Sequence, residues 1–218
     1  MPTRIVDLTA RLEPATPVYP GDEPLRVHIV ETTEDLQPDR RALNQSRLDM
    51  GLHCGTHMDS PFHFFSEGSK IDEIRLEQCV GATLLIRVPG SCDSGAVEVE
   101  DLKSHAERLQ QLRKVVLNTG WSRHWDQAQY FTRHPLISGA AATFLVDCGV
   151  HLVGVDMPSV DRPPFEAHLE LLGNDVVILE NLQNLEQIYS DVFHLIALPL
   201  KLPGREASPI RAVAVENL

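Results

Sequence analysis

The eleven residues HCGTHMDSPFH, from His53 to His63, contain three histidines and one aspartate. Neutral imidazole and carboxylate groups are the usual ligands of Zn²⁺ and of related divalent ions such as Mn²⁺. Burying such groups together without a cation leaves polar atoms unsatisfied, and protonated histidines would repel one another. We therefore predict that His53, His57, Asp59 and His63 form most of a metal site. The competing interpretation is a loop of exposed or hydrogen-bonded histidines.

The spacing of these ligands favours an extended chain over a helix. On a helix, positions 53 and 57 share a face, but position 59 lies about 200° round from 57. In an extended chain the side chains alternate, so that the four odd-numbered ligands can point to one side. Gly55 permits backbone conformations that a bulkier residue resists. Pro61 gives no hydrogen to a sheet and can turn the chain to bring His63 back toward the other ligands.

The pattern H-x-G-T-H-x-D-x-P-x-H resembles the central motif of the metal-dependent cyclase-family hydrolases, which include bacterial kynurenine formamidase and isatin hydrolase. Every fixed position of that motif is present between His53 and His63. Four other stretches are similar to the family: PVYPGD, LNTGW, GVDMPSVD and SPIRAVAV. The resemblance covers nearly the whole chain. The length of the chain matches the formamidase branch better than it matches the larger isatin hydrolases.

The resemblance implies further ligands from a distant part of the chain. In the formamidase branch a histidine and a glutamate twelve residues later complete a two-metal site, and His168 and Glu180 have that separation. By this resemblance, one metal would be bound by His53, His57 and Asp59. The second would be bound by His63 and His168, with Glu180, and Asp59 as a further candidate, bridging the two. Without the resemblance, His168 could be the polar edge of a short helix, and Glu180 could be a surface residue after a strand.

The implied activity is arylformamidase-like: N-formylkynurenine and water give kynurenine and formate through a metal-bound hydroxide. Asp59, Glu180 or His63 would carry the proton. The chain contains no G-x-S-x-G elbow for a serine nucleophile. An isatin-like cyclic amide or a lactone could be the substrate of the same site instead. An alternative of another class is a non-catalytic metal-binding module. The expected cofactor is Zn²⁺, one or two per chain, with Mn²⁺ as the alternative.

The substrate pocket is predicted from the resemblance to include aromatic residues on which an aryl ring could stack. These candidates are Tyr19, Phe64 and Trp121, and each could equally be a core residue. Three further polar residues could support the ligands from behind: Ser159, Asp161 and Asn181.

The composition restricts the partners and the compartment. The formal net charge of −12 disfavours nucleic acid and anionic membranes. The four cysteines form no C-x-x-C pair, and the N-terminus shows no secretory signal, so that a cytoplasmic protein with reduced thiols is expected. Cys54, between two candidate ligands, is interpreted as a buried thiol. The resemblance implies a homodimer or a higher homo-oligomer that acts on a small aromatic amide.

The periodicity predicts a mixed α/β fold, and the resemblance specifies it as the β/β/α swivelling-domain-like fold, strand-rich with a few helices, over one domain of residues 1–218. Short β-branched or alternating runs predict strands over 3–9, 25–32, 43–52, 82–88, 114–120, 151–159, 175–182, 193–202 and 210–218. Helices are predicted over 97–112, 138–149 and 163–173, with Ser138 as an N-cap.

Overall fold

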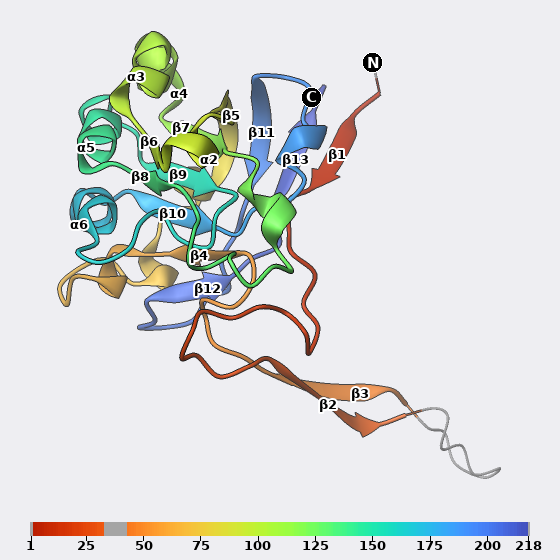
Figure 1. The fold of residues 1–218 in the computed structure, drawn as a ribbon. Coiled ribbons are helices and arrows are strands. Elements are labelled where there is room, and N and C mark those ends of the chain that lie inside the picture. Colours follow the sequence, from red (N-terminus) through yellow and green to blue (C-terminus); the bar gives the residue numbers. More distant parts are fainter. Residues whose placement is uncertain (1, 33–42, 218) are drawn as a thin grey trace.

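The computed structural model describes residues 2–32 and 43–217, and it confirms the mixed α/β class (Figure 1). Nine strands form its main sheet: β1 (Arg4–Asp7), β4 (His57–Asp59), β5 (Val80–Arg87), β7 (Lys114–Asn118), β9 (Leu152–Val155), β10 (Val177–Glu180), β11 (Val192–Ile196), β12 (Ala207–Pro209) and β13 (Val213–Glu216). Their order across the sheet is β1-β13-β11-β5-β7-β9-β10-β4-β12. The neighbours β5, β7, β9 and β10 run parallel, and the pairs on either side of them are antiparallel.

The central strands form because both of their faces are buried. Successive side chains of a strand point to opposite faces. In β7, Val115 and Leu117 therefore join the core under the helices, while Val116 joins the core on the other side. Ile178 and Leu179 of β10 divide in the same way. Parallel strands covered on both faces read as continuous apolar runs, which is why the sequence predicts them well.

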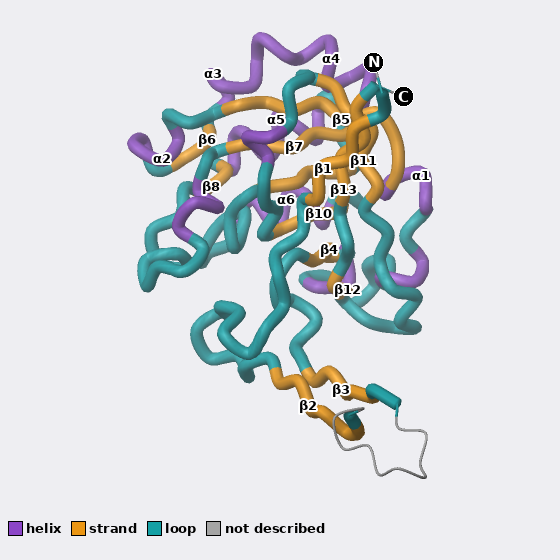
Figure 2. Tube along the Cα trace, turned by 90° about the vertical axis from the view of Figure 1, so that its right-hand side faces the viewer, coloured by secondary structure: helices purple, strands orange, loops and turns teal. Residues whose placement is uncertain are grey.

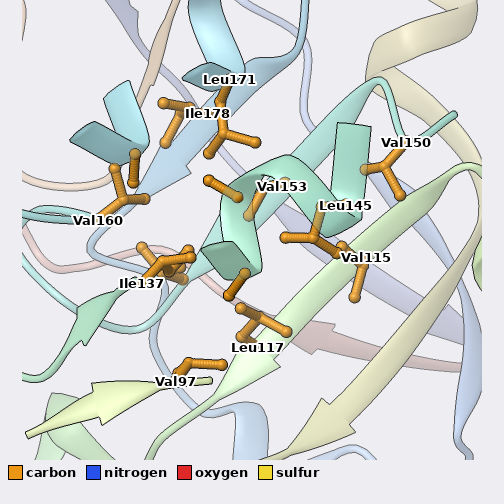
Figure 3. Packing of buried hydrophobic residues seen from close by; sticks show 14 of the residues in the cluster. Val97, Val115, Leu117, Ile137, Leu145, Val150, Val153, Val160, Leu171 and Ile178 are labelled. Atoms are coloured by element: carbon orange, nitrogen blue, oxygen red, sulfur yellow. The ribbon is translucent and has the colours of Figure 1, made fainter. Parts of the chain in front are cut away.

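In the described part of the chain, six α-helices lie outside the sheet: α1 (Leu76–Cys79), α2 (Ser91–Ser94), α3 (Val99–Leu102), α4 (Ala106–Leu112), α5 (Gly139–Asp147) and α6 (Glu166–Gly173). The Ser138 hydroxyl accepts a hydrogen bond from the Ala141 amide at 3.2 Å, so the predicted N-cap of α5 is confirmed. Helices α5 and α6 pack side by side on one face of the sheet (Figure 1). Figure 3 shows Leu145 and Leu171 from these helices beside Val153 of the sheet.

Several predicted elements are shorter than expected: the strand predicted over 43–52 covers only Gln45–Asp49, and the strand predicted over 193–202 ends at Ile196. The helix predicted over 97–112 is divided, because Val97 pairs with Ile137 in the small sheet of β6 (Ala96–Val97) and β8 (Leu136–Ile137), and a 3-10 turn at Lys103–His105 separates α3 from α4. The strand predicted over 151–159 ends at Val155. There the Asp156 carboxylate accepts hydrogen bonds from the amide and hydroxyl of Thr119, at 3.0 and 2.6 Å, and the chain leaves the sheet.

A two-stranded arm formed by β2 (Arg26–Glu31) and β3 (Gln45–Asp49) extends away from the rest of the molecule, and both views show it (Figures 1 and 2). Its apolar side chains are exposed, with Ile29 at 75% and Leu48 at 53%. Within the ranges that the structure describes, no helix is long and apolar enough to cross a bilayer.

Candidate metal centre and active site

The segment 53–63 is not extended throughout, contrary to the expectation from its spacing. Only His57–Asp59 form a strand, which lies between β10 and β12. Gly55 adopts a φ of +69°, and a Cβ at this position would lie 2.5 Å from Leu12 Cδ2. Pro61 opens a 3-10 turn that ends at His63. The segment therefore gathers its ligands by a turn, a short strand and a second turn, and the expected roles of Gly55 and Pro61 are confirmed.

Sheet pairing and helix packing bring the distant residues to this segment. In the antiparallel ladder between β4 and β10, Glu180 is the direct partner of His57. His168 lies in the first turn of α6, which packs against the 3-10 turn Pro61–His63. The Phe64 ring stacks on the His168 ring, with centroids 4.9 Å apart and planes inclined by 21°. Three regions of the sequence thus meet at one point.

The ligand atoms form two groups that share Asp59. Single donor atoms of His53, His57 and Asp59 lie within 4.8 Å of one another, and so do those of Asp59, His63 and His168. His57 Nε2 is 3.3 Å from Asp59 Oδ1 and 3.4 Å from Glu180 Oε2. His168 Nε2 is 3.5 Å from Glu180 Oε1 and 4.0 Å from Asp59 Oδ2. Each of the two carboxylates thus has one oxygen toward each group.

This donor set fits a divalent cation. His57 Nε2 and Asp59 Oδ1 are buried and have no hydrogen-bond partner among the described residues, although His53 Nδ1 is 2.9 Å from that oxygen. Buried polar atoms without a partner destabilise a fold and call for an explanation. Two ligands of one tetrahedral cation, each at about 2.0–2.1 Å, lie about 3.3 Å apart. The spacing of these atoms is therefore the spacing of ligands around a common ion.

The charges of the site indicate that a bound cation would replace protons on the buried histidines. Burial by itself lowers the pKa of His57, but Asp59 and Glu180 outweigh it and raise this pKa to about 9. Burial likewise lowers the pKa of His168, but the hydrogen bonds that its ring donates to Asp161 and Glu180 outweigh burial and raise this pKa to about 10. The pKa of His63 is lowered to about 4, mainly by burial. The carboxylates therefore hold protons on His57 and His168, which a bound cation would displace.

Both buried imidazoles are oriented by a partner on Nδ1, which leaves Nε2 facing the site. His57 Nδ1 is 2.9 Å from the Gly55 carbonyl oxygen. His168 Nδ1 is 2.6 Å from Asp161 Oδ1, while Asp161 Oδ2 accepts the amides of Ala167 and His168 at 2.7 and 3.0 Å. Such a partner fixes the tautomer and the direction of a metal-binding histidine.

The Gly55 carbonyl is part of a longer buried chain of hydrogen bonds. The side-chain amide of Asn181 donates to it at 2.9 Å, and the Tyr130 hydroxyl donates to Asn181 Oδ1 at 2.8 Å. The Thr56 hydroxyl donates to the Asn181 carbonyl at 2.7 Å. Asn181 and Asp161 therefore lie where the sequence placed them, behind the ligands. Tyr130 was missed, because a lone tyrosine in a polar loop carries no signal of its own.

The six candidate ligands lie in the lining of a cavity of about 310 Å³. Its other lining residues are mainly aromatic or proline: Pro17, Tyr19, Asp22, Phe64, Phe131, Pro158, Ser159, Phe165 and Asn181. Phe64 and Phe165 pack edge to face with ring centroids 5.4 Å apart. The cavity therefore combines a polar floor with apolar walls, which is the usual form of a small-molecule site.

The family of the chain follows from comparison with known proteins. The family model described as "Putative cyclase" matches residues 6–162. The chain belongs to the cyclase family. Kynurenine formamidase of Bacillus anthracis is 33% identical over 211 residues, which cover 95% of each chain. Kynurenine formamidase of Bacillus mycoides is 31% identical over the same share of both chains.

A solved structure agrees with this cyclase-family assignment over almost the whole chain. Isatin hydrolase A from Labrenzia aggregata, bound to benzyl benzoate, superposes with a TM-score of 0.84 at 26% identity. The match covers 98% of this chain and 93% of that protein. The strand-rich α/β fold expected from the resemblance is thus confirmed.

Of the three aromatic residues predicted for the substrate pocket of this cyclase-family protein, two line the cavity and one lies in the core. Tyr19 and Phe64 line the cavity, but Trp121 does not. Trp121 is only 5% exposed, and its indole N–H donates to the Tyr130 carbonyl at 3.0 Å, so that the expectation of a substrate contact gives way to a core role. Phe131 and Phe165 line the cavity instead, and neither was singled out in the sequence. Cys54 is a buried free thiol, as interpreted.

Proposed function

We propose that this protein hydrolyses the formamides of aromatic amines, with N-formylkynurenine as the substrate and kynurenine and formate as products. More broadly, it is a metal-dependent amide hydrolase that acts on carbon–nitrogen bonds other than peptide bonds. The observation that carries the proposal is the pair of ligand groups sharing Asp59 at the floor of an aromatic-walled cavity. A non-catalytic metal-binding module does not account for the cavity or for the hydrolase relatives.

The proposed ligand sets follow the two groups of donor atoms. His53, His57 and Asp59 would hold one ion, and His63 and His168 would hold the other. Glu180, which has one oxygen near His57 and the other near His168, would lie between them. Four imidazoles in six ligands favour Zn²⁺ over Mn²⁺. When bound, such ions lower the pKa of a water molecule and polarise a carbonyl group.

The side chains around this centre supply binding, orientation and proton transfer. Phe64 and Phe165 offer aromatic faces beside His168 on which an aryl ring can stack. Water adds its oxygen to the formyl carbon, the carbon–nitrogen bond breaks, and the amine nitrogen gains a proton. Asp59 and Glu180 are placed to accept the proton that water loses. If His63 does not bind the second ion, its ring, which makes no hydrogen bond with another described side chain, is the further candidate for delivering this proton to the amine.

A cyclic amide or a lactone is the second candidate substrate. The superposition with isatin hydrolase A, at a TM-score of 0.84 over 98% of this chain, favours it. The chemistry at the scissile carbonyl would be the same, and only the cavity walls would select between an open formamide and a ring.

The test is metal content followed by turnover. Protein purified without chelator should contain about two zinc or manganese ions per chain by elemental mass spectrometry. It should release kynurenine from N-formylkynurenine, lose this activity to a strong chelator and regain it with Zn²⁺ or Mn²⁺. Hydrolysis of isatin without turnover of N-formylkynurenine would favour the second candidate. Chelator-resistant turnover, or no binding of metal after addition, would contradict the proposal.

We also propose that residues 1–218 form one domain that acts as a homodimer or a higher homo-oligomer in the cytoplasm. An isolated two-stranded hairpin is at best marginally stable, so the exposed apolar side chains of the β2–β3 arm favour a second copy as its support. All four cysteines are free, as expected in a reducing compartment. Light scattering should give at least twice the chain mass, and Ile29→Asp should reduce it; a monomeric wild-type protein would contradict the proposal.

A further inference from the structure

Asp22 lines the cavity but does not belong to the candidate metal centre. It lies in the turn that leads into β2, where its amide donates to the Tyr19 carbonyl at 3.0 Å. Its carboxylate forms no hydrogen bond or ion pair with any residue that the structure describes. The next residue, Glu23, is different: it pairs with Arg26 at 2.9 Å and is not part of the lining. A carboxylate without a partner therefore borders the space in which a substrate would lie.

The charges of the lining are unbalanced at this point. Among the described residues that line the cavity there is no lysine or arginine. Asp59 and Glu180 are surrounded by the imidazoles of the metal centre, but Asp22 has no such neighbour within hydrogen-bond distance. A cationic group is therefore favoured beside Asp22, and an anionic group is repelled.

Two aromatic residues that line the same cavity as Asp22 fit a cation that is attached to an aryl ring. Tyr19 and Phe131, from segments distant in the sequence, pack edge to face with centroids 5.8 Å apart, and both line the cavity. Aromatic faces hold aryl rings by stacking and also attract cations. The combination of an unpaired carboxylate and two aromatic rings points to a ligand that carries both features.

We propose that Asp22 binds a primary ammonium group on the aryl part of the substrate, so that the cavity favours aryl amides that carry an ammonium group over those that lack one. This inference rests on the proposed function for the position of the scissile amide, which would lie at the metal centre. Asp22 is then the specificity-determining residue of the site.

Binding of three anilines that differ in one charge tests the inference without any turnover. At neutral pH 3-aminobenzylamine carries an ammonium, 3-aminobenzyl alcohol is neutral, and 3-aminobenzoate is anionic. Calorimetry on the metal-loaded protein should give the tightest binding for the ammonium compound, by about fivefold over the alcohol, the range of a partly exposed ion pair. The benzoate should bind most weakly. The preference should shrink at high salt, which screens exposed charges.

Two matched variants locate the effect. In Asp22→Asn the ratio between the ammonium compound and the alcohol should fall to about one. Glu23→Gln removes the neighbouring carboxylate and should keep the wild-type ratio, and Asp22→Glu should restore part of it. An Asp22→Asn protein that keeps the preference would overturn the inference, as would a wild-type protein without any preference.

The formanilides of the same three compounds separate this inference from the proposed function. Hydrolysis of all three, with a ratio of kcat/KM that depends on Asp22, would support both. Hydrolysis without a charge preference would leave the function and overturn the role of Asp22. A charge preference in binding without any hydrolysis would support the role of Asp22 as a binding residue and contradict the formamidase proposal.

Discussion

Two buried carboxylates at different places in the main sheet have different hydrogen-bond partners. Asp59 ends β4 and Glu216 ends β13, and the two residues are exposed by only 1% and 4%. Glu216 is fully partnered: the amides of Tyr189 and Ser190 donate to Oε1 at 3.0 and 2.9 Å, and Arg4 pairs with Oε2. In the described structure the polar neighbours of Asp59 Oδ1 are instead imidazole nitrogens of the candidate metal centre, His53 Nδ1 at 2.9 Å and His57 Nε2 at 3.3 Å. Glu216 is thus satisfied by the folded chain, whereas Asp59 lies among the side chains of the candidate metal centre.

The pKa values of the two carboxylates are both lowered, but by different groups. Burial raises the pKa of each, and the lowering groups outweigh it. For Glu216 these groups are the Ser190 amide, Arg4 and the Tyr189 amide, all of which belong to the folded chain. For Asp59 they are the imidazoles of neighbouring histidines, whose protons a cation would replace. The donors of Glu216 are therefore fixed parts of the fold, whereas those of Asp59 are imidazoles that could bind a cation instead.

The largest effect is expected from Asp59→Asn. The amide keeps the shape of the side chain but loses the charge that both ligand groups share, so that both ions should be lost. Hydrolysis should fall by more than about 100-fold, beyond the effect of a residue that only orients a ligand. Elemental mass spectrometry and initial rates measure this, with Glu216→Gln as the control that keeps both ions. Retention of two ions by Asp59→Asn would contradict the prediction that Asp59, unlike Glu216, is needed for metal binding.

His168→Ala should have the next largest effect, because it removes a ligand from only one of the two groups. We expect one ion per chain instead of two, with the remaining ion held by His53, His57 and Asp59. Metal content at increasing concentrations of free Zn²⁺ measures the loss. Full metal content together with full activity would show that His168 is not a ligand.

Asp161→Asn should weaken the metal centre without removing a ligand. The variant loses the negative charge that orients and polarises His168 through a contact of 2.6 Å. The expected cost is about 10- to 100-fold in metal affinity. Competition with a chelator of known affinity measures this loss of metal affinity. Asp161 also accepts hydrogen bonds from the backbone amides at the start of α6, so thermal unfolding of the metal-free variant is the control for a loss of helix stability. An unchanged affinity would mean that the helix alone orients His168.

The smallest effect on function is expected from Glu216→Gln, which should act on stability instead. Loss of the charge-assisted hydrogen bonds should lower the free energy of unfolding by about 1–2 kcal/mol at neutral pH. Because folding lowers the pKa of Glu216 from its ordinary value of 4.5, this stabilisation is present above that value and is lost as the pH falls through the folded pKa. Urea unfolding of wild type and variant should therefore converge below about pH 4.5. A gap that widens on acidification would contradict this sign.

For the fold, the sequence determined the central strands and the capped helix, and the structure decided the short elements. Apolar runs such as that of β7 predict a strand buried on both faces, and Ser138 marks the start of α5 through its own hydroxyl. β4, β6, β8 and β12 have only two or three residues each, too few for any period to be visible. Such strands exist because a neighbouring strand pairs with them.

For the site, the sequence determined which atoms are available, and the tertiary structure decided which of them meet. Residue types and local spacing sufficed to select the candidate ligands in 53–63, and family resemblance added His168 and Glu180 as candidates at their separation of twelve residues. The pairing of β4 with β10 places Glu180 opposite His57, and the packing of α6 sets His168 beside Asp59. Local spacing cannot predict such contacts, because they depend on strand register and helix packing between segments far apart in the chain.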